Sequence, residues 1–164
     1  MKPVARAEFR VRPGGILSLS GSGLKDLLAA VMTRNRPFRF RARGLSMAPF
    51  IKDGDIVTIG PLRARRLRPG DIAAFCSKET GNLIVHRIVR KRSDGFLVRG
   101  DNAAQADGPV SAADVFGRVT RVERGGREVR FGRGPERRAI AFLSRIGVLR
   151  PLIVRARKVI RIRP

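Results

Sequence analysis

The chain has no tryptophan or tyrosine, and it contains only one cysteine and one histidine. Base stacking on single-stranded nucleic acid would therefore fall to phenylalanine and arginine alone. A single cysteine excludes an intrachain disulfide, and one cysteine with one histidine does not make a zinc site. Cys76 lies in the apolar run DIAAFCS, where a free thiol is expected to pack as a small hydrophobic side chain. The composition predicts no metal and no other cofactor.

Acidic residues are also scarce, because 36 Lys and Arg face 13 Asp and Glu and leave a net charge of +23. A field of this sign attracts phosphate groups on nucleic acid or on anionic lipid, whether or not the protein is an enzyme. Hydrophobic residues make up 43% of the 164 residues, which argues against global disorder and allows one domain with a substantial core.

Long apolar runs are missing as well, since no window of about 18 uncharged apolar residues occurs. The nearest candidate, residues 139–154, is interrupted by Arg145 and Arg150, and Pro151 is expected to kink a helix there. The first 15 residues carry charges where a secretion signal has its apolar segment. We therefore expect no cleavable leader, no membrane-spanning helix, and a cytoplasmic or peripheral-membrane location.

The pattern of apolar residues divides the chain into three parts. Residues 1–36 form a basic arm followed by a helix over 22–35, which Ser22 can cap. Residues 37–132 alternate with a period of two and are broken by Gly-Asp and Pro-Gly turns. Seven short strands are predicted there, over 38–43, 55–60, 71–77, 83–91, 95–100, 115–123 and 127–131. This pattern indicates a mainly β domain, a small antiparallel barrel or folded sheet with flanking helices.

The third part, residues 133–164, is predicted to be a basic amphipathic helical tail. Its apolar residues are Ile140, Phe142, Leu143, Ile146, Leu149, Leu152, Ile153, Val159 and Ile160, and arginines lie among them. Such a segment can rest on an anionic membrane surface, where each cation contributes about 1 kcal/mol. The same apolar residues can instead pack on the β domain, and the sequence leaves both interpretations open.

The candidate chemistry is centred on Ser46, in the stretch FRARGLSMAPFIKDGDIV. A serine hydroxyl attacks a carbonyl only if a base takes its proton, and the one histidine available is His86, in the apolar strand LIVHRIV. A carboxylate is then needed to orient the imidazole. The loop RGDNAAQADGPV offers Asp101 and Asp107. Taken alone, a histidine on an apolar strand is more often a packed residue than a base.

The joint order of motifs changes that balance. The segments GLSMAPFIKDGDIV, LRPGDIAAF, LIVHRIV, VRGDNAAQADGPV and VFGRV follow one another at moderate spacing. This series, from Arg43 to about Val122, resembles the type I signal peptidases, in the branch of the endoplasmic reticulum, archaea and some bacilli that uses histidine as base. The resemblance implies a β fold shared with LexA-type peptidases and the activity of a serine endopeptidase.

The resemblance also implies a role for each matching residue. Ser46 matches the nucleophile, His86 the general base, and Asp107 the third catalytic position. Asp101 matches an aspartate that shapes the same loop, and it is the second candidate for orienting the ring. Two features depart from the pattern. Gly44 stands where the family usually has a serine whose hydroxyl helps to bind the oxyanion, a donor worth about 2.7–4 kcal/mol. The expected membrane anchor before the serine is replaced by the predicted helix.

Three functions follow as hypotheses. The first is a serine endopeptidase of the signal-peptidase type, which cleaves an extended peptide or preprotein near small residues. The second is a non-catalytic protein of the same fold, whose basic surface binds nucleic acid or an anionic membrane. The third is a self-cleaving regulator of the LexA type.

Overall fold

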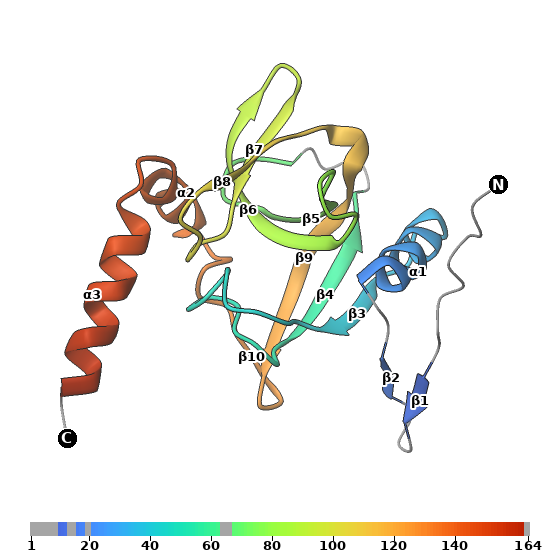
Figure 1. Ribbon diagram of the computed structural model, residues 1–164, viewed down its shortest axis with the longest axis horizontal. Coiled ribbons are helices and arrows are strands. Elements are labelled where there is room, and N and C mark those ends of the chain that lie inside the picture. The colour runs from blue at the N-terminus through green and yellow to red at the C-terminus, as the bar shows by residue number, and fades with distance from the viewer. Residues whose placement is uncertain (1–9, 13–15, 19–20, 63–66, 163–164) are drawn as a thin grey trace.

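A computed structural model describes residues 10–12, 16–18, 21–62 and 67–162 of the protein. The strands are β1 (Arg10–Arg12), β2 (Ile16–Ser18), β3 (Phe38–Arg41), β4 (Ile56–Pro61), β5 (Ile72–Cys76), β6 (Leu83–Arg92), β7 (Gly95–Arg99), β8 (Ala106–Val110), β9 (Val115–Arg124) and β10 (Arg127–Glu128). The helices are α1 (Gly21–Thr33), the short 3-10 helix η1 (Ala112–Asp114), α2 (Arg137–Arg145) and α3 (Leu149–Ile162). Figure 1 shows α1 on one side of the sheet and the α2–α3 pair on the other.

The predicted mainly β fold is confirmed. Eight strands form one antiparallel sheet in the order β3-β4-β9-β5-β6-β7-β8, with β10 paired to β9. Within the described part of the chain, β3 and β8 are free edges, so the sheet is folded and open and is not a closed barrel. The seven predicted strands did not include β1 and β2, which form a separate two-stranded sheet, and they missed one strand of the large sheet, β8, which has the sequence ADGPV. Glycine and proline hide the strand pattern, but an edge strand tolerates Pro109 because one of its sides needs no ladder hydrogen bonds.

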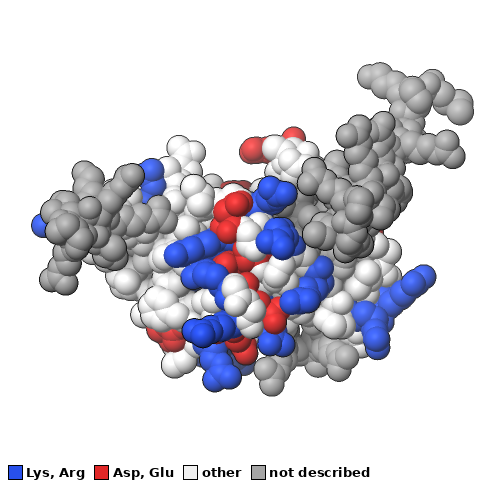
Figure 2. All heavy atoms as spheres, turned by 90° about the horizontal axis from the view of Figure 1, so that it is seen from below, with Lys and Arg blue, Asp and Glu red and all other residues white. Residues whose placement is uncertain are grey.

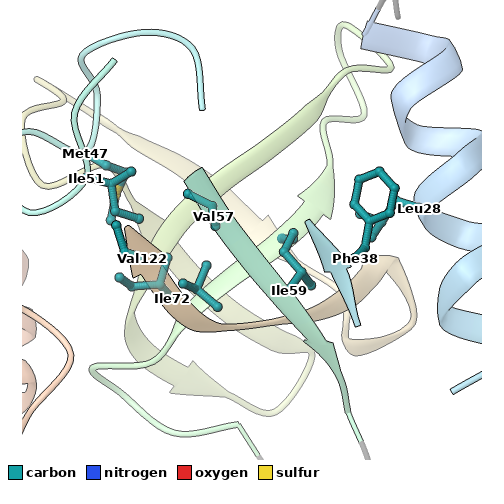
Figure 3. Close-up of a cluster of buried hydrophobic side chains, with 10 residues drawn as sticks. Leu28, Phe38, Met47, Ile51, Val57, Ile59, Ile72 and Val122 are labelled. Atoms are coloured by element: carbon teal, nitrogen blue, oxygen red, sulfur yellow. The ribbon is translucent and has the colours of Figure 1, made fainter. Parts of the chain in front are cut away.

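The larger hydrophobic cluster joins α1, the sheet and the loop that carries Ser46. Its buried members are Leu28, Phe38, Met47, Ile51, Val57, Ile59, Ile72, Ala74, Val119 and Val122. Figure 3 shows Met47 and Ile51 at one end of this cluster and Leu28 with Phe38 at the other. Burying side chains of this size stabilises the fold by about 1.5–3 kcal/mol each. The serine loop is therefore anchored in the core and does not lie loosely over it.

Both Gly-Asp motifs form the turns predicted from the sequence, and both have the same hydrogen bond. Asp55 Oδ2 accepts from the Lys52 N–H at 2.8 Å, and Asp71 Oδ2 accepts from the Arg68 N–H at 2.9 Å. In each case the donor lies three residues before the aspartate, and the next residue begins a strand, β4 or β5. A side chain that replaces a backbone partner in this way fixes the entry to the strand.

The C-terminal tail is helical, as expected, and its apolar residues divide between the two interpretations. Ile140, Leu149 and Ile153 are buried together with Phe50 of the serine loop. Phe142 and Leu152 are 59% and 49% exposed. The side chains of Val159 and Ile160 lie outside the described residues. One face of the tail therefore packs on the β domain while another remains in solvent.

The expected kink at Pro151 does not occur. Proline lacks an N–H, but Pro151 is the third residue of α3, and N–H groups in the first turn of a helix have no partner within the helix. Gly147, with φ +79°, separates α2 from α3. No helix in the described ranges is long and apolar enough to cross a membrane.

Candidate active site

Ser46 lies in the loop between β3 and β4, and hydrogen bonds hold this loop in shape. The Ala48 N–H donates to the Leu45 carbonyl at 3.1 Å, and the Ile51 N–H donates to the Met47 carbonyl at 3.0 Å. Met47 and Ile51 are buried, whereas Ser46 is exposed. The Met-x-Pro turn thus directs the serine outward while its neighbours point into the core.

The structure brings Ser46, His86 and Asp107 together in one line. His86 Nε2 lies 2.8 Å from Ser46 Oγ, and His86 Nδ1 lies 2.5 Å from Asp107 Oδ2. The prediction that Ser46 and His86 lie within hydrogen-bond reach is confirmed. Because a carboxylate only accepts, the Nδ1 of a neutral ring carries the proton, which leaves the Nε2 lone pair facing the serine hydroxyl. This is the arrangement in which an imidazole can remove a hydroxyl proton.

Asp101 does not join that line, and the alternative that it orients the ring needs correction. Its side chain is fully buried, and its two oxygens accept from Arg87 Nε and Nη2, both at 2.8 Å. Burial raises the pKa of Asp101, while the hydrogen bonds and the charge of Arg87 act in the opposite direction. Asp101 thus holds Arg87, and of the two candidates it is Asp107 that contacts the imidazole.

Arg87, which the sequence interpretation did not single out, links four segments beneath the site. Besides Asp101, its Nη1 donates to the Gly70 carbonyl at 2.9 Å and to the Gly132 carbonyl at 2.8 Å. Its guanidinium lies 5.4 Å from the centre of the Phe50 ring. The available signal was an arginine inside an apolar strand, because a charge there needs buried partners. Arg87 is therefore a positioning residue for the strand that carries His86.

The Gly-Asp-Asn turn holds the serine loop against His86. The Asn102 N–H donates to the Ser46 carbonyl at 2.7 Å, and Asn102 Nδ2 donates to the Leu45 carbonyl at 3.2 Å. A Cβ placed on Gly100 would lie 2.8 Å from the Ser46 carbonyl oxygen and 2.9 Å from His86 Nε2. Only glycine fits between the Ser46 backbone and the His86 ring at this point.

Gly44 is held in a conformation that suits glycine. Its φ is +93°, in the left-handed region that L side chains rarely adopt, although a Cβ there would meet nothing within 4 Å. Its N–H donates to Asp53 Oδ1 at 2.8 Å. The Ser46 N–H makes no hydrogen bond to another described residue. An oxyanion at this site would therefore take its donor from the serine backbone, because position 44 has no hydroxyl.

A groove of about 580 Å³ opens beside Ser46 and His86. Its walls are Leu24, Phe40, Arg41, Ala42, Arg43, Gly44, Met47, Ile51, Val57, Asn82, Leu83, Ile84 and Val85. Strand β5 pairs with Leu83 and the residues after it, but β7 pairs with β6 only from Arg87 onward. Among the described strands, none pairs with the second edge of residues 83–86, and this segment lines the groove together with residues 41–44. An extended peptide can be added between two such walls.

Metal chemistry finds no support in the side chains that the structure describes, because they contain no group of three His, Cys, Asp or Glu able to hold an ion. Cys76 is only half-buried, and its Sγ lies 3.5 Å from the Gly81 carbonyl oxygen. The expected packing of this thiol as a core side chain is therefore met only in part, because Cys76 is the last residue of β5 and remains partly exposed.

The comparison with known families agrees with this geometry. Residues 19–120 match the family described as Peptidase S24-like. The chain belongs to this family. The matched range contains Ser46, His86 and Asp107, together with both walls of the groove. No curated protein matches the chain.

Proposed function

We propose that this S24-like protein is a serine endopeptidase of the signal-peptidase type, with Ser46 as nucleophile, His86 as general base and Asp107 as the residue that orients the ring. The observation that carries this proposal is the continuous line from Asp107 through His86 to Ser46, at 2.5 and 2.8 Å, beside a groove with a free strand edge. The histidine base supports the branch of the endoplasmic reticulum and archaea over the branches with a lysine base.

In the proposed mechanism, Ser46 Oγ attacks the scissile carbonyl of a peptide bound in the groove while His86 Nε2 takes the hydroxyl proton. Asp107 stabilises the imidazolium that forms, and the Ser46 N–H donates to the oxyanion. His86 then returns the proton to the leaving amine, which departs and leaves an ester on Ser46. Water, activated by the same imidazole, hydrolyses this ester and restores the free hydroxyl.

Covalent labelling tests the proposal. A fluorophosphonate probe should label the wild-type protein on Ser46, and Ser46→Ala should remove the label. Ser111, a hydroxyl that caps η1, supplies the control, since Ser111→Ala should leave labelling unchanged. Absence of labelling in folded wild-type protein would instead favour a non-catalytic descendant. Self-cleavage of the LexA type would give fragments at a rate independent of protein concentration, with no turnover of added peptide.

We also propose that the exposed face of α2 and α3 rests on an anionic membrane. Phe142, Ile146, Val148, Leu152 and Val154 are each at least 40% exposed, and neither helix contains an acidic residue. Binding of nucleic acid alone gives no reason to expose these apolar side chains. On the face that Figure 2 shows, basic and acidic side chains lie among one another. Ion pairs of this kind join Arg39 to Glu123 and Arg133 to Glu128.

Co-sedimentation with vesicles tests this second proposal. Binding should require phosphatidylserine, weaken in high salt, and fall when Phe142 and Leu152 are both changed to serine. Leu27, which is 37% exposed on α1, is the matched control, because Leu27→Ser should leave binding unchanged. Equal binding to neutral vesicles, or none to anionic ones, would contradict it.

A further inference from the structure

The charged side chains that line the described part of the groove beside Ser46 are all positive. Among its lining residues in the described ranges, the side chains with a permanent charge are Arg41 and Arg43, and no Asp or Glu is present. The remaining walls are mostly apolar, apart from Asn82 and the pair of Ser46 and His86. A peptide in this groove would therefore have no acidic wall residue to repel a carboxylate and two cations to attract one.

Arg39, Arg41 and Arg43 lie at alternate positions along β3 and the start of the serine loop, and they differ in their hydrogen-bond and ion-pair partners. Arg39 donates to Glu123 from Nε at 3.0 Å, so a carboxylate of the protein already balances its charge. Arg41 Nη1 donates to the Gly54 carbonyl at 3.3 Å. Arg43 is exposed and makes no hydrogen bond or ion pair to another described residue. The charge nearest to Ser46 along the chain is thus the one without a partner.

The neighbouring acid does not neutralise Arg43. Asp53 accepts the Gly44 N–H at 2.8 Å, but it is not one of the residues that line the groove, and among the described side chains it makes no ion pair with Arg43. Lys52, next to Asp53 in the chain, is also exposed and adds a positive charge to this loop. The groove side of this loop remains positive.

We propose that the groove selects peptides with an acidic side chain in the segment that lies between residues 41–44 and 83–86, and that Arg43 is the specificity-determining residue. This inference rests on the proposed function, whose substrate class it narrows. A bound peptide covers Arg43 and excludes water from it, which strengthens its attraction to a carboxylate and its repulsion of a lysine. Acidic peptides should therefore be preferred over basic ones, because the unpaired charge of Arg43 is positive.

Binding to the Ser46→Ala protein tests this inference without requiring turnover. The fluorescent peptides would have alanine on both sides of the peptide bond that faces position 46. One position at a time, up to five residues before or after that bond, would carry Glu, Gln or Lys, and the peptides would not differ otherwise. Fluorescence anisotropy at low and high salt would give each affinity. Arg43→Glu and Arg43→Gln would be compared with Arg90→Glu, a reversal of an exposed arginine four residues beyond His86 on β6 and outside the groove.

We expect the best Glu peptide to bind about tenfold more tightly than its Lys counterpart, with the difference shrinking in high salt. Arg43→Glu should reverse the preference, Arg43→Gln should reduce it, and Arg90→Glu should keep it. The inference is overturned if Arg43→Glu retains the wild-type preference, if Glu and Lys peptides bind equally, or if no peptide binds at millimolar concentration.

The same proteins separate this inference from the proposed function. Labelling of Ser46 with no charge preference would leave the peptidase proposal and remove the acidic specificity. A preference that depends on Arg43, in a protein whose Ser46 is never labelled, would leave a peptide-binding groove and remove the catalysis. Unchanged thermal unfolding of Arg43→Glu would exclude a folding defect as the cause.

Discussion

Asp101 lies in the loop between β7 and β8, and Asp107, six residues later, lies in β8 itself. The two carboxylates have different partners and different surroundings. The Asp101 side chain is fully buried and makes two hydrogen bonds to Arg87. The Asp107 side chain is 25% exposed and contacts the His86 ring. One carboxylate is therefore placed to hold the loop together, and the other is placed to act on an imidazole.

The difference originates in β6, where His86 and Arg87 are consecutive. Successive side chains of a strand point to opposite faces of the sheet, so Arg87 meets Asp101 in the loop before β8, whereas His86 meets Asp107 in β8. Arg87 points to the side with the Gly70 and Gly132 carbonyls, and His86 points toward Ser46. Two consecutive residues of one strand thus bind different carboxylates: Arg87 binds the buried Asp101, and His86 binds Asp107 beside the serine.

Asp107→Asn gives the largest expected effect and tests this division. An amide in place of the carboxylate can favour the wrong tautomer of His86 and cannot stabilise its charged form. By analogy with other Ser-His-Asp sites, we expect the labelling rate of Ser46 to fall by about 10⁴, with the free energy of unfolding changed by less than about 1 kcal/mol. Probe kinetics and urea unfolding would measure the two quantities. Near-wild-type labelling would show that the His86 ring does not depend on Asp107.

Asp101→Asn should have the opposite profile. It leaves the buried Arg87 charge without its counter-ion, so we expect unfolding to become easier by about 3–5 kcal/mol. The folded fraction should keep much more of its labelling rate than Asp107→Asn does. The double variant Arg87→Met with Asp101→Leu removes both charges, and it should recover part of the stability, although the carbonyls of Gly70 and Gly132 then lose a donor. A stable Asp101→Asn protein with no labelling would reverse the assigned roles.

The sequence predicted the sheet because side chains in its strands alternate in burial, as in β4, where Val57 and Ile59 are buried and Ile56 and Thr58 between them are partly exposed. It missed β8 because the edge strand ADGPV depends on pairing with β7 and not on a hydrophobic pattern. The motifs located Ser46, His86 and Asp107, but the roles of Arg87 and Asn102 depend on segments up to 57 residues apart. An arginine inside an apolar strand indicates that buried partners are needed, but the sequence has no local signature of which residues supply them.

The same limit applies to the tail. Its amphipathic pattern indicated a helix, and the structure contains two, α2 and α3. The pattern did not tell which apolar side chains would be covered, because that depends on Phe50, which packs with Ile140, Leu149 and Ile153. Periodicity describes the faces of a helix, whereas the shape of the domain decides which face is buried.

A smaller effect is expected for Asp55, a buried carboxylate whose ion-pair partner, Arg124, is partly exposed to solvent. Burial by itself would raise the pKa of Asp55, but hydrogen bonds from Arg124 and from the Lys52 N–H lower it below its ordinary value of 3.8. A lowered pKa means that the folded state favours the charged form, so the stabilisation is present above pH 3.8 and is lost as pH falls through the folded pKa.

Asp55→Asn should therefore lower stability at neutral pH and remove this part of the acid sensitivity. We expect a loss of about 1–2 kcal/mol at pH 7, less than for Asp101→Asn, because the Arg124 side chain is 36% exposed and solvent screens the pair. Urea unfolding of the wild-type and Asp55→Asn proteins from pH 7 to pH 3 would measure the gap between their free energies of unfolding. This gap should narrow below about pH 4. Glu79→Gln, which neutralises an exposed carboxylate, should show no such gap. A gap that stayed constant or widened on acidification would mean that the charge of Asp55 contributes nothing, and that its neutral hydrogen bonds alone hold the turn into β4.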